Sequence, residues 1–125
     1  MNRLIAALIL CLAACNPSLA AAARDVSSTE AKTVIDKAKN VFILDVRSPQ
    51  ERSQGYIPGS QLIPIEIIER RLAEIPKNRP IVVYCAVGSR SRAVAQGLSR
   101  LGYAEVYNMR DGIMGWYRNG YPIQR

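Results

Sequence analysis

Cys85 is the residue of this sequence whose surroundings best suit chemistry. It follows four apolar residues, 81–84, and precedes a segment of mostly small and polar residues that ends at Ser91. A short apolar run rich in β-branched residues predicts a strand buried on both faces, and the helical spacing after Ser91 predicts a helix. The carboxyl ends of parallel strands are where open α/β sheets bind their ligands. The sequence therefore places a thiol at a position suited to a nucleophile.

The thiol can act as a nucleophile only if its loop stabilises the thiolate. An ordinary cysteine has a pKa of about 8.5 and is mostly protonated at neutral pH. The sequence contains no histidine, which excludes Cys-His pairs, Ser-His-Asp triads and histidine-ligated metals. Backbone N–H groups, the terminus of the following helix and the Arg90 guanidinium are the available sources of positive charge. Gly88 supplies the backbone freedom that a curled loop needs.

Several helices are expected to position this loop. Capping boxes begin at Ser27 and at Ser48, and a proline at the first helical position supports the second. Apolar spacing predicts an amphipathic helix from Ile65 to Ile75 and a final helix over 112–117. The helix after Cys85 is expected to turn four apolar residues inward: Ala93, Val94, Leu98 and Leu101.

Strands are expected between these helices. Buried strands are predicted at 41–44 and 81–84, and shorter strands at 61–63 and 106–107. The alternation of strands and helices predicts an α/β fold, with a parallel sheet of about five short strands and helices on both faces. No repeat or interdomain linker is evident, so residues 24–125 are expected to form a single domain.

The first 22 residues are typical of a signal peptide. Arg3 precedes an apolar run, 4–14, that is too short to span a bilayer. Two processing patterns compete: residues 18–20 suit ordinary signal peptidase, whereas residues 12–15 resemble the lipobox of bacterial lipoproteins, with Cys15 lipidated. The chain is therefore expected in the bacterial periplasm, or anchored by lipid to a membrane and facing the periplasm. Under either outcome Cys85 is the one cysteine left with a free thiol.

The charge of the chain favours anionic partners. Seventeen Lys and Arg residues against ten Asp and Glu residues give a net charge of +7. The basic residues are spread from Arg24 to Arg125, without a dense block or an aromatic stacking platform, so no nucleic-acid partner is expected. A positive field can also steer a small anion toward the site.

Five segments between Asp25 and Ile123 occur in a distinctive order. They are Asp45-Val46-Arg47 with Glu51, Gly55 to Ser60, Tyr84 to Ser91, Leu101-Gly102-Tyr103, and Asp111-Gly112-Ile113 with Trp116. In these segments the sequence resembles the rhodanese family of sulfurtransferases, and the C-x-x-G-x-R spacing that begins at Cys85 is a moderately specific part of the match. The resemblance implies a rhodanese-like fold over the whole mature chain.

The resemblance also implies a reaction and its residues. Cys85 would attack the sulfane sulfur of a donor such as thiosulfate, release sulfite, and pass the sulfur from a persulfide to cyanide or to a thiol, which a partner protein can carry. No cofactor or metal is implied. The residues implied to line the substrate pocket are Ala86, Val87, Gly88, Ser89, Arg90 and Ser91, and those implied to form a supporting polar group are Asp45, Arg47 and Glu51.

Some residues depart from the family pattern. Tyr56 stands where the family often has histidine, and Asp111 stands where it often has glycine. We expect these two differences to change loop packing rather than to abolish activity. Ala86 and Val87 make the loop more apolar than the loops of some members, which weakens the case for thiosulfate as the preferred donor.

Two other functions stay open at this point. Cysteine phosphatases resemble rhodaneses but carry the arginine six positions after the cysteine, whereas Arg90 lies five positions after Cys85 and Ser91 lies at six. A shorter cradle should suit a sulfur atom better than a tetrahedral phosphate. The other alternative is a noncatalytic sulfur carrier or binding module, since a fold does not guarantee an activity.

Overall fold

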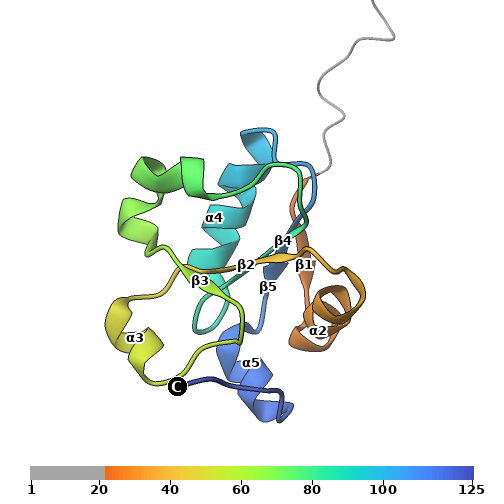
Figure 1. The fold of residues 1–125 in the computed structure, drawn as a ribbon, viewed down its shortest axis with the longest axis vertical. Helices are drawn as coiled ribbons and strands as arrows, with labels where there is room; N and C mark the ends of the chain where they lie inside the picture. Colours follow the sequence, from red (N-terminus) through yellow and green to blue (C-terminus); the bar gives the residue numbers. More distant parts are fainter. Residues whose placement is uncertain (1–21) are drawn as a thin grey trace, which may run out of the picture.

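The computed structural model describes residues 22–125, so the predicted leader up to residue 21 and both of its processing patterns lie outside the described residues. A five-stranded sheet forms the centre of the domain, in the order β1-β5-β4-β2-β3, and every pair of strands is parallel (Figure 1). The strands are β1 (Arg24–Val26), β2 (Phe42–Asp45), β3 (Gln61–Leu62), β4 (Ile81–Tyr84) and β5 (Val106–Met109). The predicted α/β fold is confirmed.

Helices cover both faces of the sheet. They are α2 (Ser28–Lys37), α3 (Pro49–Ser53), the 3-10 helix η2 (Ile65–Glu74), α4 (Ser89–Arg100) and α5 (Gly112–Arg118). Alternate residues of β4 divide the core into two layers. Ile81 and Val83 pack on the side of η2 and α4, whereas Val82 and Tyr84 pack on the side of α2 and α5. Within residues 22–125, no helix has the length and apolar character needed to cross a bilayer.

Both predicted capping boxes are present. The Ser27 hydroxyl accepts the N–H of Glu30, and the Ser48 hydroxyl accepts the N–H of Glu51, while each glutamate accepts the N–H of its serine in return. Each box satisfies two backbone donors that the helix itself leaves unpaired. The second box fixes the start of α3 and the place of Glu51, which becomes important at the candidate site.

Two predictions about helices were wrong. The amphipathic segment from Ile65 is mostly a 3-10 helix with non-helical backbone angles at Arg71, rather than an α-helix. Three of its first four residues are β-branched isoleucines, and no side chain caps its start, so the local preference for an α-helix is weak. In α4 the buried apolar residues are Val94, Ala95 and Leu98. Ala93 points outward, and Leu101 is 53% exposed because α4 ends at Arg100.

The sequence did not locate the fifth strand, β1. It has only three residues, and two of them are charged and exposed. Strand β1 pairs with β5 along one edge of the sheet, where Asp25 lies opposite Asn108. Pairing with a neighbour distant in sequence, rather than local propensity, makes this segment a strand.

Candidate active site

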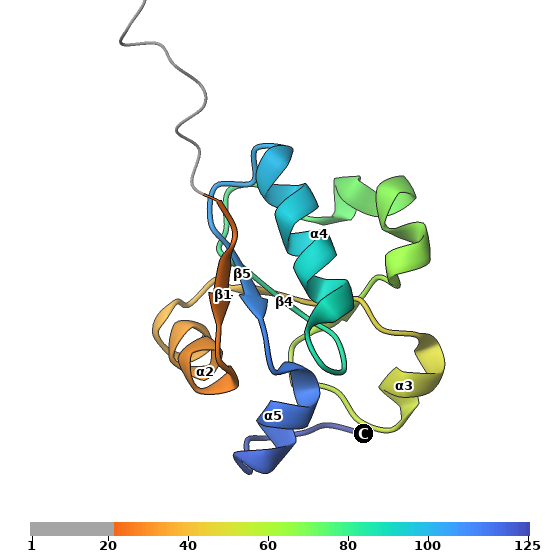
Figure 2. The same ribbon diagram turned by 180° about the vertical axis from the view of Figure 1, so that it is seen from behind.

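The loop that presents Cys85 runs from the end of β4 to the start of α4. Figure 2 shows this loop beside the first turn of α5. Gly88 is the N-cap of α4 and has a φ of 100°, a conformation that side chains other than glycine rarely adopt. A Cβ atom at this position would lie 2.1 Å from the carbonyl oxygen of Arg110. Gly88 is therefore required both by its backbone angles and by the close approach of the next loop.

The sulfur of Cys85 lies in a cradle of hydrogen-bond donors. The residue has no exposed surface. Its Sγ accepts the backbone N–H groups of Gly88 at 3.1 Å and Ser91 at 3.5 Å, and the Ser91 hydroxyl at 3.4 Å. Burial raises the pKa of the thiol, but these hydrogen bonds and one from the N–H of Val87 outweigh it and hold the pKa below its usual value. The cradle thus favours the reactive thiolate.

The first turn of α5 holds the outer side of the loop. The N–H of Ile113 donates to the carbonyl oxygen of Cys85 at 2.9 Å, and the N–H of Met114 donates to that of Ala86 at 3.2 Å. Gly112 permits this contact, because a Cβ there would lie 2.1 Å from the Ala86 oxygen. The carbonyl groups are satisfied by α5, so the N–H groups that follow them in the loop can converge on the sulfur.

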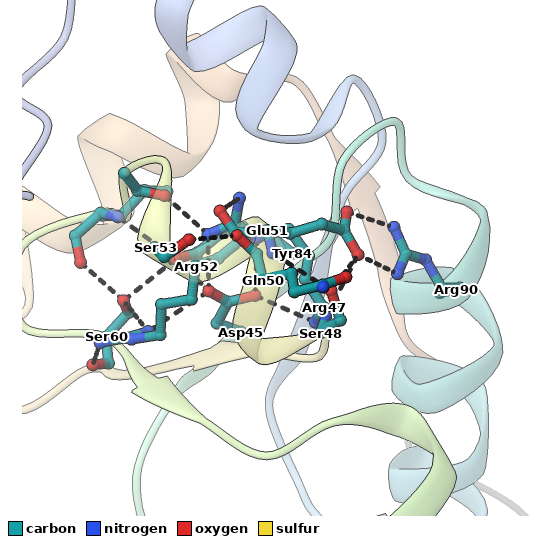
Figure 3. Close-up of polar contacts among 12 residues, drawn as sticks. Asp45, Arg47, Ser48, Gln50, Glu51, Arg52, Ser53, Ser60, Tyr84 and Arg90 are labelled. Carbon is teal, nitrogen blue, oxygen red and sulfur yellow. Dashed lines mark hydrogen bonds and ion pairs between the residues drawn. The ribbon is translucent and has the colours of Figure 1, made fainter.

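Arg90 binds Glu51 rather than the sulfur. Its Nη1 and Nη2 donate to the two carboxylate oxygens of Glu51 at 2.7 and 2.8 Å (Figure 3). These bonds lower the pKa of Glu51 to about 2 and raise that of Arg90. The sequence suggested Arg90 as a cation for the thiolate. In the structure its guanidinium does not donate to Sγ but links the first turn of α4 to α3. Its charge still interacts with the charge of the Cys85 thiolate, which is one cause of the raised pKa of Arg90.

The implied supporting group divides into two connected parts. Asp45 is buried and accepts the Nε of Arg47 at 2.9 Å, the Nη2 of Arg47 at 2.8 Å and the hydroxyl of Tyr84 at 3.0 Å. Burial raises the pKa of Tyr84 to about 12, so its hydroxyl stays protonated and can donate. Glu51 belongs to the Arg90 pair instead, and only its backbone oxygen accepts from Arg47, at 3.4 Å. Since Tyr84 precedes Cys85, the buried group anchors the end of β4 (Figure 3).

Sequence reasoning missed several residues of this neighbourhood. Arg52 donates to Asp45 at 3.3 Å and to the hydroxyl of Ser60 at 3.1 Å. Asn108, which is buried in β5, donates through Nδ2 to Asp25 at 3.0 Å and to the carbonyl oxygen of Gly88 at 3.4 Å. Asparagine is uncommon inside strands, and its presence directly after the predicted strand at 106–107 is the one feature of the sequence that could have drawn attention to Asn108.

The other loop residues contact the sulfur only through their backbone or not at all. Tyr56 and Asp111, which depart from the family pattern, do not contact it. Val87 is 63% exposed, and Ser89 is exposed at the first position of α4. Tyr56 packs its ring under the guanidinium of Arg52, 3.9 Å from the ring centre. Asp111 accepts the N–H and the hydroxyl of Ser28, each at 2.7 Å, and thereby joins the starts of α2 and α5.

The arrangement can bind an anion and stabilise a thiolate. Within residues 22–125, no group of three or more Cys, Asp or Glu side chains is placed to hold a metal ion. Donors that converge on one sulfur atom can also bind the outer sulfur of a persulfide, because both species carry negative charge at the same place. The chemistry available here is nucleophilic attack by Cys85 followed by release of the bound atom.

Several known proteins are similar to this chain. The family model described as "Rhodanese-like domain" matches residues 27–119. A protein of Allochromatium vinosum named sulfurtransferase is 37% identical over 99 residues, which are 79% of this chain and 92% of that protein. A protein of Pseudoalteromonas translucida named thiosulfate sulfurtransferase is 30% identical over 93 residues, covering 74% of this chain and 88% of its own length. The crystal structure of a rhodanese-related protein from Thermoplasma volcanium has a TM-score of 0.73 and 33% identity, and the match covers 81% of this chain and 97% of that chain.

Proposed function

Because the chain belongs to the family of rhodanese-like domains, we propose that it is a sulfurtransferase in which Cys85 carries the transferred sulfur as a persulfide. The observation that supports this proposal most strongly is the set of donors on one sulfur: the N–H groups of Gly88 and Ser91 and the hydroxyl of Ser91 all point at Sγ. These donors favour the thiolate, and relatives of the chain are named sulfurtransferases.

The proposed reaction has two steps. In the first, the Cys85 thiolate attacks the outer sulfur of thiosulfate, the S–S bond of the donor breaks, and sulfite leaves with the electron pair. In the second, a thiolate or cyanide attacks the outer sulfur of the Cys85 persulfide, and Cys85 leaves as a thiolate. Each step forms one bond to sulfur and breaks one, so no external oxidant or reductant is required.

The loop serves both steps through the same donors. Before the first step they stabilise the Cys85 thiolate, and after it they can bind the negatively charged outer sulfur, so the environment does not have to reorganise during the reaction. The ion pair of Arg90 with Glu51 keeps the start of α4 in place against α3. The residues proposed for substrate binding are Ala86 to Ser91, acting mainly through their N–H groups.

The donor is proposed with support from a relative. Thiosulfate is named in the sulfurtransferase of Pseudoalteromonas translucida, and thiosulfate and cyanide are the probes for a first assay. Purified protein mixed with both should release sulfite and form thiocyanate, and Cys85→Ser should do neither. The same protein should leave an aryl phosphate intact. Hydrolysis of the aryl phosphate that depends on Cys85, without sulfite release, would instead identify a cysteine phosphatase.

A noncatalytic carrier would behave differently in the same assay. With thiosulfate alone it would take up one sulfur atom per chain, and cyanide would remove that atom no faster than it removes sulfur from a small-molecule persulfide. Formation of thiocyanate over many equivalents of protein, at a rate per persulfide well above that of the small molecule, would exclude this alternative. A rate equal to that of the small molecule would support it and contradict the catalytic proposal.

We further propose that the protein works after export to the periplasm, either free or anchored through lipid on Cys15. The proposal rests on the leader-like composition of the first 22 residues. The mass of the mature protein isolated from its source cells tests it. Loss of the leader with a free N-terminus, or with a lipid on Cys15, would agree with export, and an uncleaved chain recovered from the cytoplasm would refute it.

A further inference from the structure

Apolar side chains are exposed beside the cysteine loop. Val87 is 63% exposed at the tip of the loop, and Met114 is 47% exposed on α5. The two residues lie close together, because the N–H of Met114 donates to the carbonyl oxygen of Ala86. Tyr117, 36% exposed, is three positions further along α5 and shares a helix face with Met114. We name Val87, Met114 and Tyr117 the apolar rim.

Two exposed arginines have backbone atoms close to Gly88 of the cysteine loop. Arg92 is in the first turns of α4, where its N–H donates to the carbonyl oxygen of Gly88, and Arg110 packs its carbonyl group against Gly88. Their side chains are 62% and 52% exposed, and their ion pairs are long, at 4.0 Å to Asp25 and 3.6 Å to Glu30. Exposed pairs of this kind contribute little and leave the cations open to other anions.

The arginine inside the loop is not available in the same way. Both terminal nitrogens of Arg90 are bound to the carboxylate of Glu51 at short distances. A small dianion such as thiosulfate therefore meets a cradle of N–H groups without an unpaired guanidinium on the loop itself. It would also gain nothing from the apolar side chains around it.

A larger partner would use all of these features. A cysteine on a polypeptide segment could reach the cradle while apolar residues next to it cover Val87, Met114 and Tyr117. Acidic residues further along the segment would then meet Arg92 and Arg110. The excess of basic over acidic residues, which persists when Arg3 leaves with the leader, favours the approach of such a segment.

We propose that Cys85 passes its sulfur to a cysteine of a partner protein, and that this cysteine lies between apolar residues with acidic residues beyond them. The inference rests on the proposed function, because it needs the Cys85 persulfide. The partner thiolate attacks the outer sulfur of that persulfide, the S–S bond to Cys85 breaks, and Cys85 leaves as a thiolate. The partner then holds the persulfide, and no electrons enter or leave the pair.

Model peptides test this inference. The persulfide is formed on the full mature chain with thiosulfate or inorganic polysulfide, and its transfer is followed by mass spectrometry. Three acceptors are compared with cyanide: Asp-Leu-Cys-Leu-Asp, Lys-Leu-Cys-Leu-Lys and Asp-Gly-Cys-Gly-Asp. The first should react about tenfold faster than the second at low salt, and the difference should shrink as salt is added. It should also react several times faster than the third, which lacks the apolar residues.

Two variants separate a contribution of the surface around the loop from a general change in the reactivity of the persulfide. Met114→Ser and Arg92→Gln should each lower the ratio of the rate with the acidic apolar peptide to the rate with cyanide, by about threefold or more. Leu101→Ser is the matched control, because Leu101 is 53% exposed at the far end of α4, and it should leave this ratio unchanged.

The possible failures are distinguishable. Absence of any Cys85 persulfide would refute the proposed function itself. A persulfide that forms and reacts with cyanide, but reacts equally with the three peptides, would refute only the inference about the partner. The inference would also be refuted if Leu101→Ser lowered the peptide-to-cyanide rate ratio as much as Met114→Ser and Arg92→Gln do, because the effect would then not come from the apolar rim.

Discussion

Ser91→Ala should raise the pKa of the Cys85 thiol by about one unit. The Ser91 hydroxyl lies 3.4 Å from Sγ and 3.1 Å from the carbonyl oxygen of Gly88, and its single proton can serve one acceptor at a time. Beside a protonated thiol it donates to the carbonyl; beside a thiolate it turns to the sulfur, because a bond to a charged acceptor is stronger. A bond to a charged group contributes about 1.5–3 kcal/mol and a neutral one about 0.5–1.5 kcal/mol. The difference between the midpoints of these ranges, about 1.2 kcal/mol, corresponds to about one pKa unit.

The pH dependence of alkylation by iodoacetamide measures this pKa directly, since only the thiolate reacts. The wild-type midpoint should lie below that of an ordinary cysteine, because hydrogen bonds hold the pKa down. Ser89→Ala is the control, since Ser89 is exposed two positions earlier and is not among the residues whose hydrogen bonds lower the Cys85 pKa. Equal midpoints for wild type and Ser91→Ala would refute the reasoning, as would an equal rise in Ser89→Ala.

Three further predictions concern the frame of the site. Gly88→Ala should lower the free energy of unfolding by about 2 kcal/mol or more in a denaturant titration, because Gly88 has a positive φ and lies against the Arg110 carbonyl group. Gly97→Ala is the control: a Cβ at this position in α4 would meet open space, and the substitution should raise the free energy of unfolding by up to about 1 kcal/mol. The pKa of Glu51 is lowered from 4.5 to about 2. The stability from its carboxylate is therefore present above about pH 4.5 and lost as the pH falls toward 2, and Glu51→Gln should remove that part of the acid sensitivity in pH-dependent unfolding. Tyr84→Phe should cost about 1.5–3 kcal/mol in thermal or denaturant unfolding, because buried Asp45 loses a donor; an unchanged stability would contradict the anchoring role given to this hydroxyl.

Much of the fold followed from local sequence patterns. The capping boxes at Ser27 and Ser48 could be found because the serine and the glutamate of each box lie only three positions apart in the sequence. The buried strand β4 was found because both of its faces are covered, which gives an unbroken apolar run. Strand β1 was missed, since its exposed charged residues form a strand only through pairing with β5.

The candidate site was predictable in its centre and less so in its surroundings. Cys85 and its loop could be placed at the end of a strand from spacing alone. The partners of Arg90 and Asn108 could not be predicted, because Glu51 lies 39 positions from Arg90 in the sequence and Asp25 lies 83 positions from Asn108. Contacts at such separations depend on the order of strands in the sheet, which alternation of helices and strands does not determine.

The proposed reaction requires that the sulfur in transit be bound covalently to Cys85. Intact-mass analysis of the mature protein, mixed with thiosulfate and then freed of excess donor, tests this requirement. A gain of the mass of one sulfur atom, absent in Cys85→Ser and removed by cyanide, is the predicted result. No gain with thiosulfate or with any other sulfane donor, or a gain that persists in Cys85→Ser, would contradict the claim.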